Sequence, residues 1–283
     1  MTQTKQQQAL DKIEAFHALQ CPVCGLPLLT GESSLRCGKG HTYDIARKGY
    51  VHLHHKTVQS EYDRQLFEAR RAVFDAGIYG EVFNALKERM QQLHPKTVLD
   101  AGCGEGFYTH SLASAMPDCL FIGIDLSKDA IVAAAGRSAS ALYCVGDLNR
   151  LPFADNTFDV ILNILSPASY TSFARVLRKG GRLIKIMPGR EYLQEIREKL
   201  PGDKNGYDDT KVPDYLREHM NLEAIDRLHY TSPLTKELYA HFLNMTPLTQ
   251  SLLADERKAL ESHIPAHITI DLQLAVCTSK IKV

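Results

Sequence analysis

The chain has 283 residues, of which 44% are hydrophobic and 23% charged, and its 33 basic and 33 acidic side chains give a formal net charge of zero. Such a chain is long enough for roughly two globular domains, and its neutrality excludes a global electrostatic signal for nucleic acid or membranes. It contains no apolar run of about 18 residues and its N-terminus has no leader-like pattern, so we expect a cytoplasmic protein with no membrane partner.

The first element in chain order is a cysteine-rich segment, CPVCGLPLLTGESSLRCGKGH, over residues 21–41. Cys21 and Cys24 are spaced as C-x2-C, and His41 comes four positions after Cys37. Two short-spaced pairs of this kind can converge on one ion, and Zn²⁺ takes four such ligands as a tetrahedron. Because the protein fills all four positions, we expect one structural Zn²⁺ per chain. Unlinked buried cysteines and a redox dithiol are weaker alternatives, the latter because no thioredoxin-like βαβ pattern surrounds the pair.

The segment that follows, TYDIARKGYVHLHHK (42–56), mixes aromatic, histidine and basic side chains. Tyr43 and Tyr50 with Arg47 and Lys48 suit base stacking and phosphate neutralisation, and an ordinary solvated face is an equally open interpretation. A domain this short buries too little apolar area to fold alone, so metal binding would supply much of its folding free energy. We therefore predict a zinc-binding RNA-recognition domain over residues 1–60 and a second domain over residues 61–283.

Helices and strands alternate in the remainder of the chain. Residues 66–94 have helical periodicity in two pieces broken at Gly77. Further helices are predicted over 128–139 and 169–179. Alternation of this kind predicts an α/β fold, in which a parallel sheet is flanked by helices. The predicted strands are 97–100, 119–125, 141–147, 158–165 and 180–189.

A glycine-rich turn follows the first of these strands, with Gly102, Gly104 and Gly106 at alternate positions. A dinucleotide-binding turn would read G-x-G-x-x-G directly after the strand, which this turn does not. Three strands end near a carboxylate, at Asp100, Asp125 and Asp147. Carboxylates at one sheet edge suit a ligand with a cationic amino group, a ribose diol and an adenine edge. S-adenosylmethionine fits that description, although each aspartate alone could be a helix cap.

Four further stretches carry a family resemblance: VLDAGCGEGFYT, GIDLSKDAI, GDLNRLPFADNTFDVIL and RVLRKGGRLIKIMPG. They resemble the motifs of class I S-adenosylmethionine-dependent methyltransferases. Together with the cysteine-rich segment and ARRAVFDAGIYGEV, the chain resembles the RlmA/TlrB family of 23S ribosomal RNA (guanine-N1-)-methyltransferases over residues 18–279. The stretch LNILSPAS looks like the Gram-positive, RlmA(II)-like branch, which includes macrolide-resistance enzymes.

This resemblance implies a class I Rossmann-like domain with a final antiparallel strand pair, for which EAIDRLHYTSPL and HITIDLQLAVCTS are candidates. It also implies zinc on the four ligands above, and cofactor contacts at Tyr79, Gly104 and Glu105. Tyr192 occupies a cofactor position where relatives carry histidine, and for both tyrosines plain packing is the alternative. The full expected cofactor set is Tyr79, Asp100, Gly102, Gly104, Glu105, Asp125, Leu126, Asp147, Leu148 and Tyr192.

The implied reaction is methyl transfer to guanine N1, which lies on the Watson–Crick edge and is reachable only in a loop or after extrusion of the base. Candidate pocket walls follow the fourth strand. Some group must also take the N1 proton, and His52, His54, His55 or a nearby aspartate are open choices. The candidate wall residues are Asn163, Ser166, Pro167 and Tyr170.

The leading hypothesis is therefore an enzyme that methylates a 23S rRNA hairpin, as a monomer or as a homodimer whose two zinc modules form one RNA cleft. A small-molecule methyltransferase like those of quinone biosynthesis is an alternative, but it leaves the zinc segment unexplained. A non-catalytic zinc-ribbon nucleic-acid-binding protein is the third possibility, disfavoured by the intact glycine turn and acidic strand ends.

Overall fold

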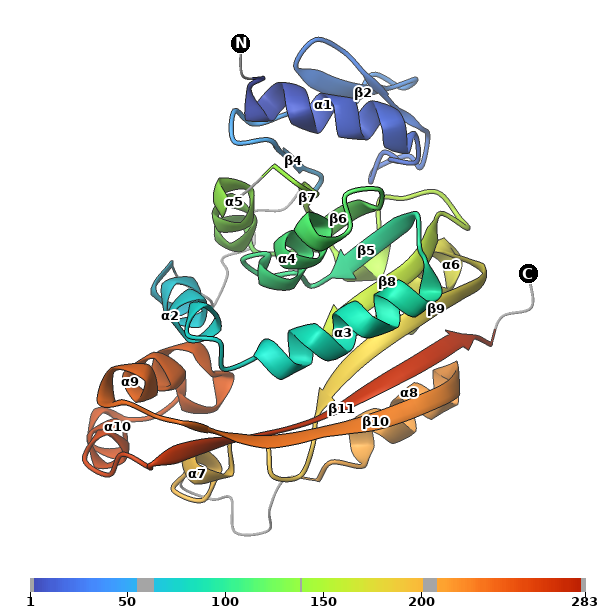
Figure 1. Cartoon of the computed structure of the whole chain (residues 1–283). Coiled ribbons are helices and arrows are strands. Elements are labelled where there is room, and N and C mark those ends of the chain that lie inside the picture. Colours follow the sequence, from blue (N-terminus) through green and yellow to red (C-terminus); the bar gives the residue numbers. More distant parts are fainter. Residues whose placement is uncertain (1–2, 55–63, 138, 201–207, 281–283) are drawn as a thin grey trace.

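The computed structural model describes residues 3–54, 64–137, 139–200 and 208–280 (Figure 1). The predicted domain boundary between residues 60 and 61 lies outside these described residues, and so do His55 and Lys56. Within the described ranges, no helix is both long and apolar enough to cross a membrane.

The N-terminal part places a helix beside a small antiparallel sheet (Figure 1). Helix α1 (Lys5–Phe16) begins at Thr4, whose hydroxyl accepts a hydrogen bond from the backbone N–H of Gln7. Ile13 and Phe16 are buried on its inner side. The small sheet has the order β1–β2–β3 and consists of β1 (Leu28–Thr30), β2 (Ser34–Cys37) and β3 (Thr42–Asp44).

An eight-stranded mixed sheet forms the centre of the described structure. Its strands from β9 to β4 pair in parallel, whereas β11 is antiparallel to β9 and β10 is antiparallel to β11. Parallel strands bring their carboxyl ends to one edge, where ligands bind in open α/β sheets. In order across the sheet the strands are β10 (Met220–Pro233), β11 (His267–Ser279), β9 (Leu177–Pro188), β8 (Phe158–Ile164), β5 (Thr97–Ala101), β6 (Leu120–Asp125), β7 (Leu142–Val145) and β4 (Tyr50–His52).

Helices cover both faces of this sheet (Figure 1). On one face α3 (Gly80–Leu93) presents Val82, Leu86 and Met90, which are spaced four residues apart and are fully buried. That spacing places them on one side of the helix, so α3 is held by apolar packing on the sheet. The same face carries α4 (Phe107–Ala115) and α5 (Lys128–Arg137), and the opposite face carries α1, α6 (Tyr170–Val176) and α8 (Lys211–His219).

The remaining helices gather at one end of the molecule, where α2 lies beside α9 (Figure 1). As predicted, the helical pattern over 66–94 is broken at Gly77, because its φ of +79° is a left-handed conformation that favours glycine. The helices at this end are α2 (Arg64–Asp75), α7 (Gln194–Arg197), α9 (Lys236–Met245) and α10 (Ala254–Glu261), with the short 3₁₀ turn η2 (Pro247–Thr249). The other 3₁₀ turn, η1 (Leu148–Arg150), lies beside α6 instead.

The predicted antiparallel strand pair is confirmed in β10 and β11. The predicted helix over 169–179 is too long, because it ends at Val176. Leu177 is 2% exposed and pairs with Phe158 of β8, so burial and backbone pairing draw the next residues into β9. The alternating pattern of helices and strands otherwise gives the predicted α/β sheet.

Backbone pairing and a shared core join the N-terminal part to the large sheet. Strand β4 extends the sheet beyond β7. Phe16 of α1 lies edge-on to Phe153, with ring centroids 5.8 Å apart. Lys5 Nζ donates a hydrogen bond of 2.7 Å to the carbonyl of Ala135, at the end of α5. The cysteine-rich segment is therefore held against the β7 end of the sheet.

Candidate active site and metal centre

The four predicted metal ligands come together, and their ligand atoms all lie within 4.8 Å of one another. Cys24 Sγ is 3.6 Å from Cys37 Sγ, and His41 Nδ1 is 3.4 Å from Cys21 Sγ and 3.3 Å from Cys37 Sγ. Zinc bonds of about 2.3 Å to sulfur and about 2.0 Å to nitrogen, set as a tetrahedron, separate ligand atoms by roughly 3.5–3.8 Å. The donor set therefore fits Zn²⁺, and four protein ligands make the site structural.

A tight turn positions the first pair of thiols, and a tyrosine hydroxyl contacts one of them. Gly25 donates its backbone N–H to the Cys21 carbonyl over 2.8 Å with a φ of +73°, which closes the first turn. Tyr43 Oη lies 3.2 Å from Cys21 Sγ. Burial alone would raise the pKa of the Cys21 thiol, but hydrogen bonds from Tyr43 and the backbone outweigh it and lower the pKa to about 6. Tyr43 is only 6% exposed, so the stacking role considered for it is wrong, and its hydroxyl supports a metal ligand instead.

The glycine-rich turn leaves β5 and leads into α4 at the carboxyl edge of the sheet. Gly102 has a φ of +81°, and a Cβ atom there would lie 1.9 Å from Ser166 Oγ. A Cβ at Gly106, whose φ is +74°, would lie 2.8 Å from the Cβ of Ala134. Side chains are thus excluded at both positions, by conformation and by close neighbours. The turn packs directly under the loop that follows β8.

The three predicted acidic strand ends lie in different surroundings. Asp125 accepts hydrogen bonds of 2.9 Å from the backbone N–H groups of Gly104 and Ser127, and Asp147 accepts one of 2.9 Å from Asn149. Both aspartates line a pocket. Asp100 is 2% exposed, lies behind the turn and accepts a hydrogen bond from the Thr109 hydroxyl. Burial raises the pKa of Asp100 to about 7.

The pocket has a volume of about 1080 Å³ and opens at the carboxyl ends of the strands. Small-molecule sites usually occupy about 300–1,000 Å³, so there is room for a nucleoside-sized cofactor and a second ring system. Its donor and acceptor set, with backbone glycines and two carboxylates, fits the amino group and ribose of S-adenosylmethionine. Of the predicted residues, the lining includes Tyr79, Gly102, Gly104, Asp125, Leu126, Asp147, Leu148, Ser166, Pro167, Tyr170 and Tyr192.

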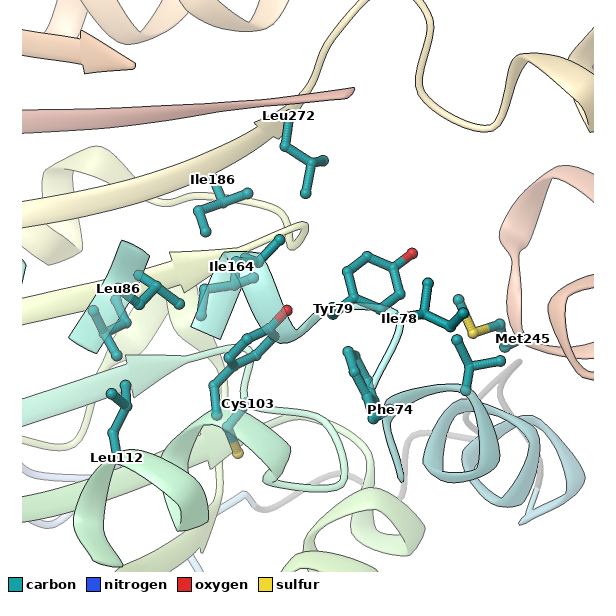
Figure 2. Close-up of a cluster of buried hydrophobic side chains, with 14 of the residues drawn as sticks. Phe74, Ile78, Tyr79, Leu86, Cys103, Leu112, Ile164, Ile186, Met245 and Leu272 are labelled. Atoms are coloured by element: carbon teal, nitrogen blue, oxygen red, sulfur yellow. The ribbon is translucent and has the colours of Figure 1, made fainter. Parts of the chain in front are cut away.

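Tyr79 lies between α2 and α3, where Phe74 packs against it with ring centroids 5.0 Å apart (Figure 2). Figure 2 also places Ile78 and Met245 beside these rings. The Tyr79 and Tyr192 hydroxyls are 2.7 Å apart, so the two predicted tyrosines form one hydrogen-bonded pair at the pocket wall. Their roles in cofactor binding remain predictions.

Glu105 is 3% exposed and lies outside the pocket lining. Its Oε2 is 3.3 Å from Nε of Arg70, which does line the pocket. Glu105 therefore neighbours the pocket through Arg70. The guanidinium, which sequence reasoning missed, stands over the glycine turn, with its Cζ 3.8 Å from where a Gly104 Cβ would be. It is suited to an anionic group such as a carboxylate.

Asn163 is fully buried and also lies outside the pocket lining. Its Nδ2 donates to the carbonyls of Ala101 over 2.7 Å and Pro167 over 3.1 Å. It thereby ties the end of β5 to the loop that carries Ser166 and Pro167. The loop itself, with Tyr170 beyond it, lines the pocket as predicted for the acceptor side.

Of the open choices for a proton acceptor, neither His52 nor His54 lines the pocket. Several lining residues from α2 and α8 were missed, because nothing local in the sequence places these helices at the sheet edge. One lining residue of β9, Lys185, was missed as well. Lys185 had a usable signal, since a lysine in the middle of an apolar parallel strand is unusual. The informative missed residues are Arg70, Phe74, Lys185, Lys211 and Tyr215.

Two protein families match separate parts of the chain. Residues 19–57 match a family described as "RlmA, N-terminal", a zinc ribbon. Residues 94–223 match a family described as "Methyltransferase domain". The first match contains the four clustered ligands, and the second contains the glycine-rich turn.

Whole-length relatives carry ribosomal RNA names. A Bacillus subtilis protein, YxjB, named "Putative 23S rRNA (guanine-N(1)-)-methyltransferase", is 34% identical over 275 residues, covering 92% of this chain and 97% of that protein. The 23S rRNA (guanine(748)-N(1))-methyltransferase of Streptomyces fradiae is 27% identical over 268 residues, covering 92% of this chain and 96% of that protein. A malonyl-[acyl-carrier protein] O-methyltransferase of Hahella chejuensis is 31% identical, but it covers only 50% of this chain and 54% of its own.

Among solved structures, the YcgJ protein of Bacillus subtilis superimposes with a TM-score of 0.53 at 16% identity. The match covers 72% of this chain and all of that chain. At this identity it supports the fold of the sheet domain alone.

Proposed function

This chain belongs to the family of 23S ribosomal RNA (guanine-N1-)-methyltransferases, and from that premise we propose that it transfers a methyl group from S-adenosylmethionine to N1 of a guanine in a hairpin loop of 23S rRNA. The observation that carries the proposal is the union, on one chain, of a Cys₃His ribbon with a pocket of about 1080 Å³ at the sheet edge. A methyltransferase fold without the ribbon would not indicate which molecule accepts the methyl group.

We propose that Asp125 and Asp147 hold the ribose and adenine side of the cofactor, with Leu126 and Leu148 against the base. All four line the pocket. Bound S-adenosylmethionine supplies an electrophilic methyl group on a sulfonium. The protein's contribution is to hold the acceptor nitrogen within about 3–3.5 Å of the reacting carbon and in line with its leaving group.

The acceptor base would enter beside the loop after β8 and the aromatic rim next to it. Tyr170 and Tyr215 both line the pocket, with ring centroids 5.5 Å apart, and Tyr215 is 52% exposed. An exposed aromatic at a pocket mouth offers a stacking face to an extruded base or its neighbour. His219 extends this rim at 4.2 Å from the Tyr215 ring.

The zinc ribbon would grip the RNA backbone. Arg36, Lys39, Arg47 and Lys48 are exposed on and next to its strands, where they can neutralise phosphates. We propose residues 1–60 as this RNA-recognition domain, residues 61–283 as the methyltransferase domain, and the cytoplasm as the place where ribosomal RNA is met. A homodimer with two ribbons around one RNA stays a prediction, which sedimentation with and without RNA would test.

The direct test supplies the purified protein with tritiated S-adenosylmethionine and 23S rRNA from a strain that lacks its gene. We expect label on one guanine, seen as a primer-extension stop because N1 methylation blocks pairing. Label on tRNA alone, or on no RNA, would contradict the proposal.

Small-molecule and acyl-carrier acceptors deserve a parallel assay, because part of the chain resembles an acyl-carrier O-methyltransferase. A variant of a zinc ligand, Cys24→Ser, should lose RNA methylation. If the intact protein methylates such acceptors and Cys24→Ser does so equally well, the small-molecule alternative is favoured. A failure of the intact protein to bind S-adenosylmethionine would favour the non-catalytic alternative.

A further inference from the structure

Lys185 lies in the middle of β9 with its side chain pointing to two oxygen acceptors. Its Nζ donates to Oδ1 of Asn163 and, over 2.7 Å, to the carbonyl of Ser166. Asn163 stands opposite it on β8, and Ala275 stands opposite it on β11. The residue is 4% exposed yet lines the pocket. Lys185 therefore lies at the bottom of the part of the pocket that we assign to the acceptor base, under the loop that follows β8.

A buried ammonium is costly unless an anion compensates it. In the described part of the chain no carboxylate forms a hydrogen bond or ion pair with Lys185, and burial lowers its pKa to about 8. The titratable groups on the same face are Cys277 of β11, Tyr170 of α6, and Tyr215 of α8. The other charged groups that line the pocket are Arg70, Asp125, Asp147, Arg197 and Lys211.

The two acceptors match a neutral amine. An uncharged lysine has two N–H bonds and one lone pair, whereas an ammonium has three N–H bonds. With Asn163 and Ser166 each accepting one N–H, one tetrahedral position of Nζ remains, and in the neutral amine that position is the lone pair. Because the residue lines the pocket, we propose that Lys185 is the catalytic base that removes the N1 proton of the guanine. This inference rests on the proposed function.

As guanine N1 attacks the methyl carbon, the N1–C bond forms and the C–S bond breaks, with its electron pair left on sulfur. The N1 proton passes to Nζ of Lys185, and the resulting ammonium donates to Asn163 Oδ1 and the Ser166 carbonyl. Both hydrogen bonds strengthen as Nζ becomes positively charged, because hydrogen bonds from charged donors are stronger. The proton later leaves to solvent.

The test is single-turnover methylation of 23S rRNA, with enzyme and cofactor saturating, from pH 6 to pH 10. Because only the neutral amine accepts a proton, the wild-type rate should rise with pH through about 8 and then level off. Lys185→Met should lower the plateau by about 100-fold to 10,000-fold. Lys185→Arg keeps a donor but cannot act as a base near neutral pH, so it should be equally slow. Lys236→Met, at an exposed lysine of α9, is the matched control and should keep the wild-type rate.

Chemical rescue separates a base from a structural support. Small primary amines should restore methylation to Lys185→Ala, with a rescue rate that depends on the pKa of the amine. Near wild-type activity of Lys185→Arg, or a rising pH limb that persists unchanged in that variant, would overturn the inference. Rescue that is independent of amine pKa would also overturn it, because filling the space would then be enough.

Two further measurements keep the outcomes distinct. Isotopic acetylation of lysines across pH, read by mass spectrometry, should titrate Lys185 near 8 without any turnover; a value near that of an exposed lysine would contradict the inference. Retained S-adenosylmethionine affinity in Lys185→Met shows that the variant is folded. If wild-type protein methylates no guanine in 23S rRNA, the proposed function fails; if wild type is active and Lys185→Met matches it, only the assignment of the base fails.

Discussion

The metal centre and the sheet pocket are assembled in opposite ways. All four ligands of the metal centre fall within residues 21–41, so two short turns bring them close and the ion supplies the binding energy. The pocket collects residues between Leu66 and Leu248, from helices on several sides of the sheet. Its geometry therefore depends on packing across the whole fold. We therefore expect loss of the metal to disrupt the metal centre locally. The pocket should instead be sensitive to small steric and electrostatic changes.

The largest effect is expected from removing a zinc ligand. In isolated zinc modules the metal contributes about 10–16 kcal/mol, so Cys37→Ser should unfold β1 to β3 and almost abolish RNA methylation. Hydrogen exchange over residues 28–44 and titration with S-adenosylmethionine would measure both sites. Cofactor affinity should be unchanged, as in the control Cys119→Ser, a buried cysteine far from the ribbon in sequence. Retained protection of the ribbon strands would mean that packing on the sheet, and not the metal, holds them.

A steric change should damage the pocket and spare the ribbon. Gly102→Ala places a Cβ 1.9 Å from Ser166 Oγ at a φ of +81°. A left-handed alanine costs about 1–2 kcal/mol and overpacking about 1–3 kcal/mol, so the free energy of unfolding should fall by up to about 5 kcal/mol. The displaced turn should also bind S-adenosylmethionine more weakly. Calorimetry with S-adenosylmethionine would measure it. Gly136→Ala in α5, with nothing within 4 Å of its Cβ, should bind normally. Equal affinities for the two variants would mean that the turn is not part of the cofactor site.

Buried charge should make the sheet domain sensitive to pH. Burial raises the pKa of Asp100 from 3.8 to about 7, so the folded state favours the protonated acid. That stabilisation is complete below about pH 4 and is lost as pH rises through about 7. Relative to Asp100→Asn, the wild-type free energy of unfolding should fall over this range by up to about 4 kcal/mol. Denaturant titrations between pH 4 and pH 8 would measure it, with the exposed Asp118→Asn as control; parallel curves for wild type and Asp100→Asn would contradict the assignment.

The smallest effect concerns the tyrosine pair. Tyr79→Phe removes the 2.7 Å bond to the Tyr192 hydroxyl and should lower the free energy of unfolding by about 1 kcal/mol. If Tyr79 also contacts the cofactor, affinity for S-adenosylmethionine should fall by about fivefold. Tyr230→Phe, which loses a bond to the Ile78 carbonyl outside the pocket lining, is the control and should lose stability without losing affinity. The same affinity in both variants would leave Tyr79 with a packing role alone.

The sequence predicted best those features that are formed by residues a few positions apart. The ligand set and the glycine turn both follow from residues close in sequence. The antiparallel pair β10–β11 joins strands separated by three helical elements, and it was expected only from the family resemblance. Helix α1, by contrast, was not predicted, since its stability depends on the burial of residues such as Phe16 against the distant Phe153. The end of α6 was placed too late for the same reason, because pairing with β8 decides where β9 begins.

The site divides in the same way. Asp125 and Asp147 could be placed at the pocket because strand ends in a parallel sheet meet at one edge. Asp100 ends a strand too, but its side chain turns behind the glycine loop toward Thr109. No sequence pattern distinguishes these two outcomes, since they depend on which direction the side chain leaves the turn. Arg70 and Tyr215 reach the pocket only through the docking of α2 and α8.

The short strand β4 lies at the edge of the large sheet, next to β7. Its 3 residues cover the outer side of β7, whose 4 residues are all buried. Removing residues 1–53 would remove β4 and expose the backbone N–H and C=O groups at the edge of β7. Another molecule could then add a strand to this edge, which is a common route to aggregation. Expression of the methyltransferase part by itself should therefore yield insoluble material unless this strand is retained.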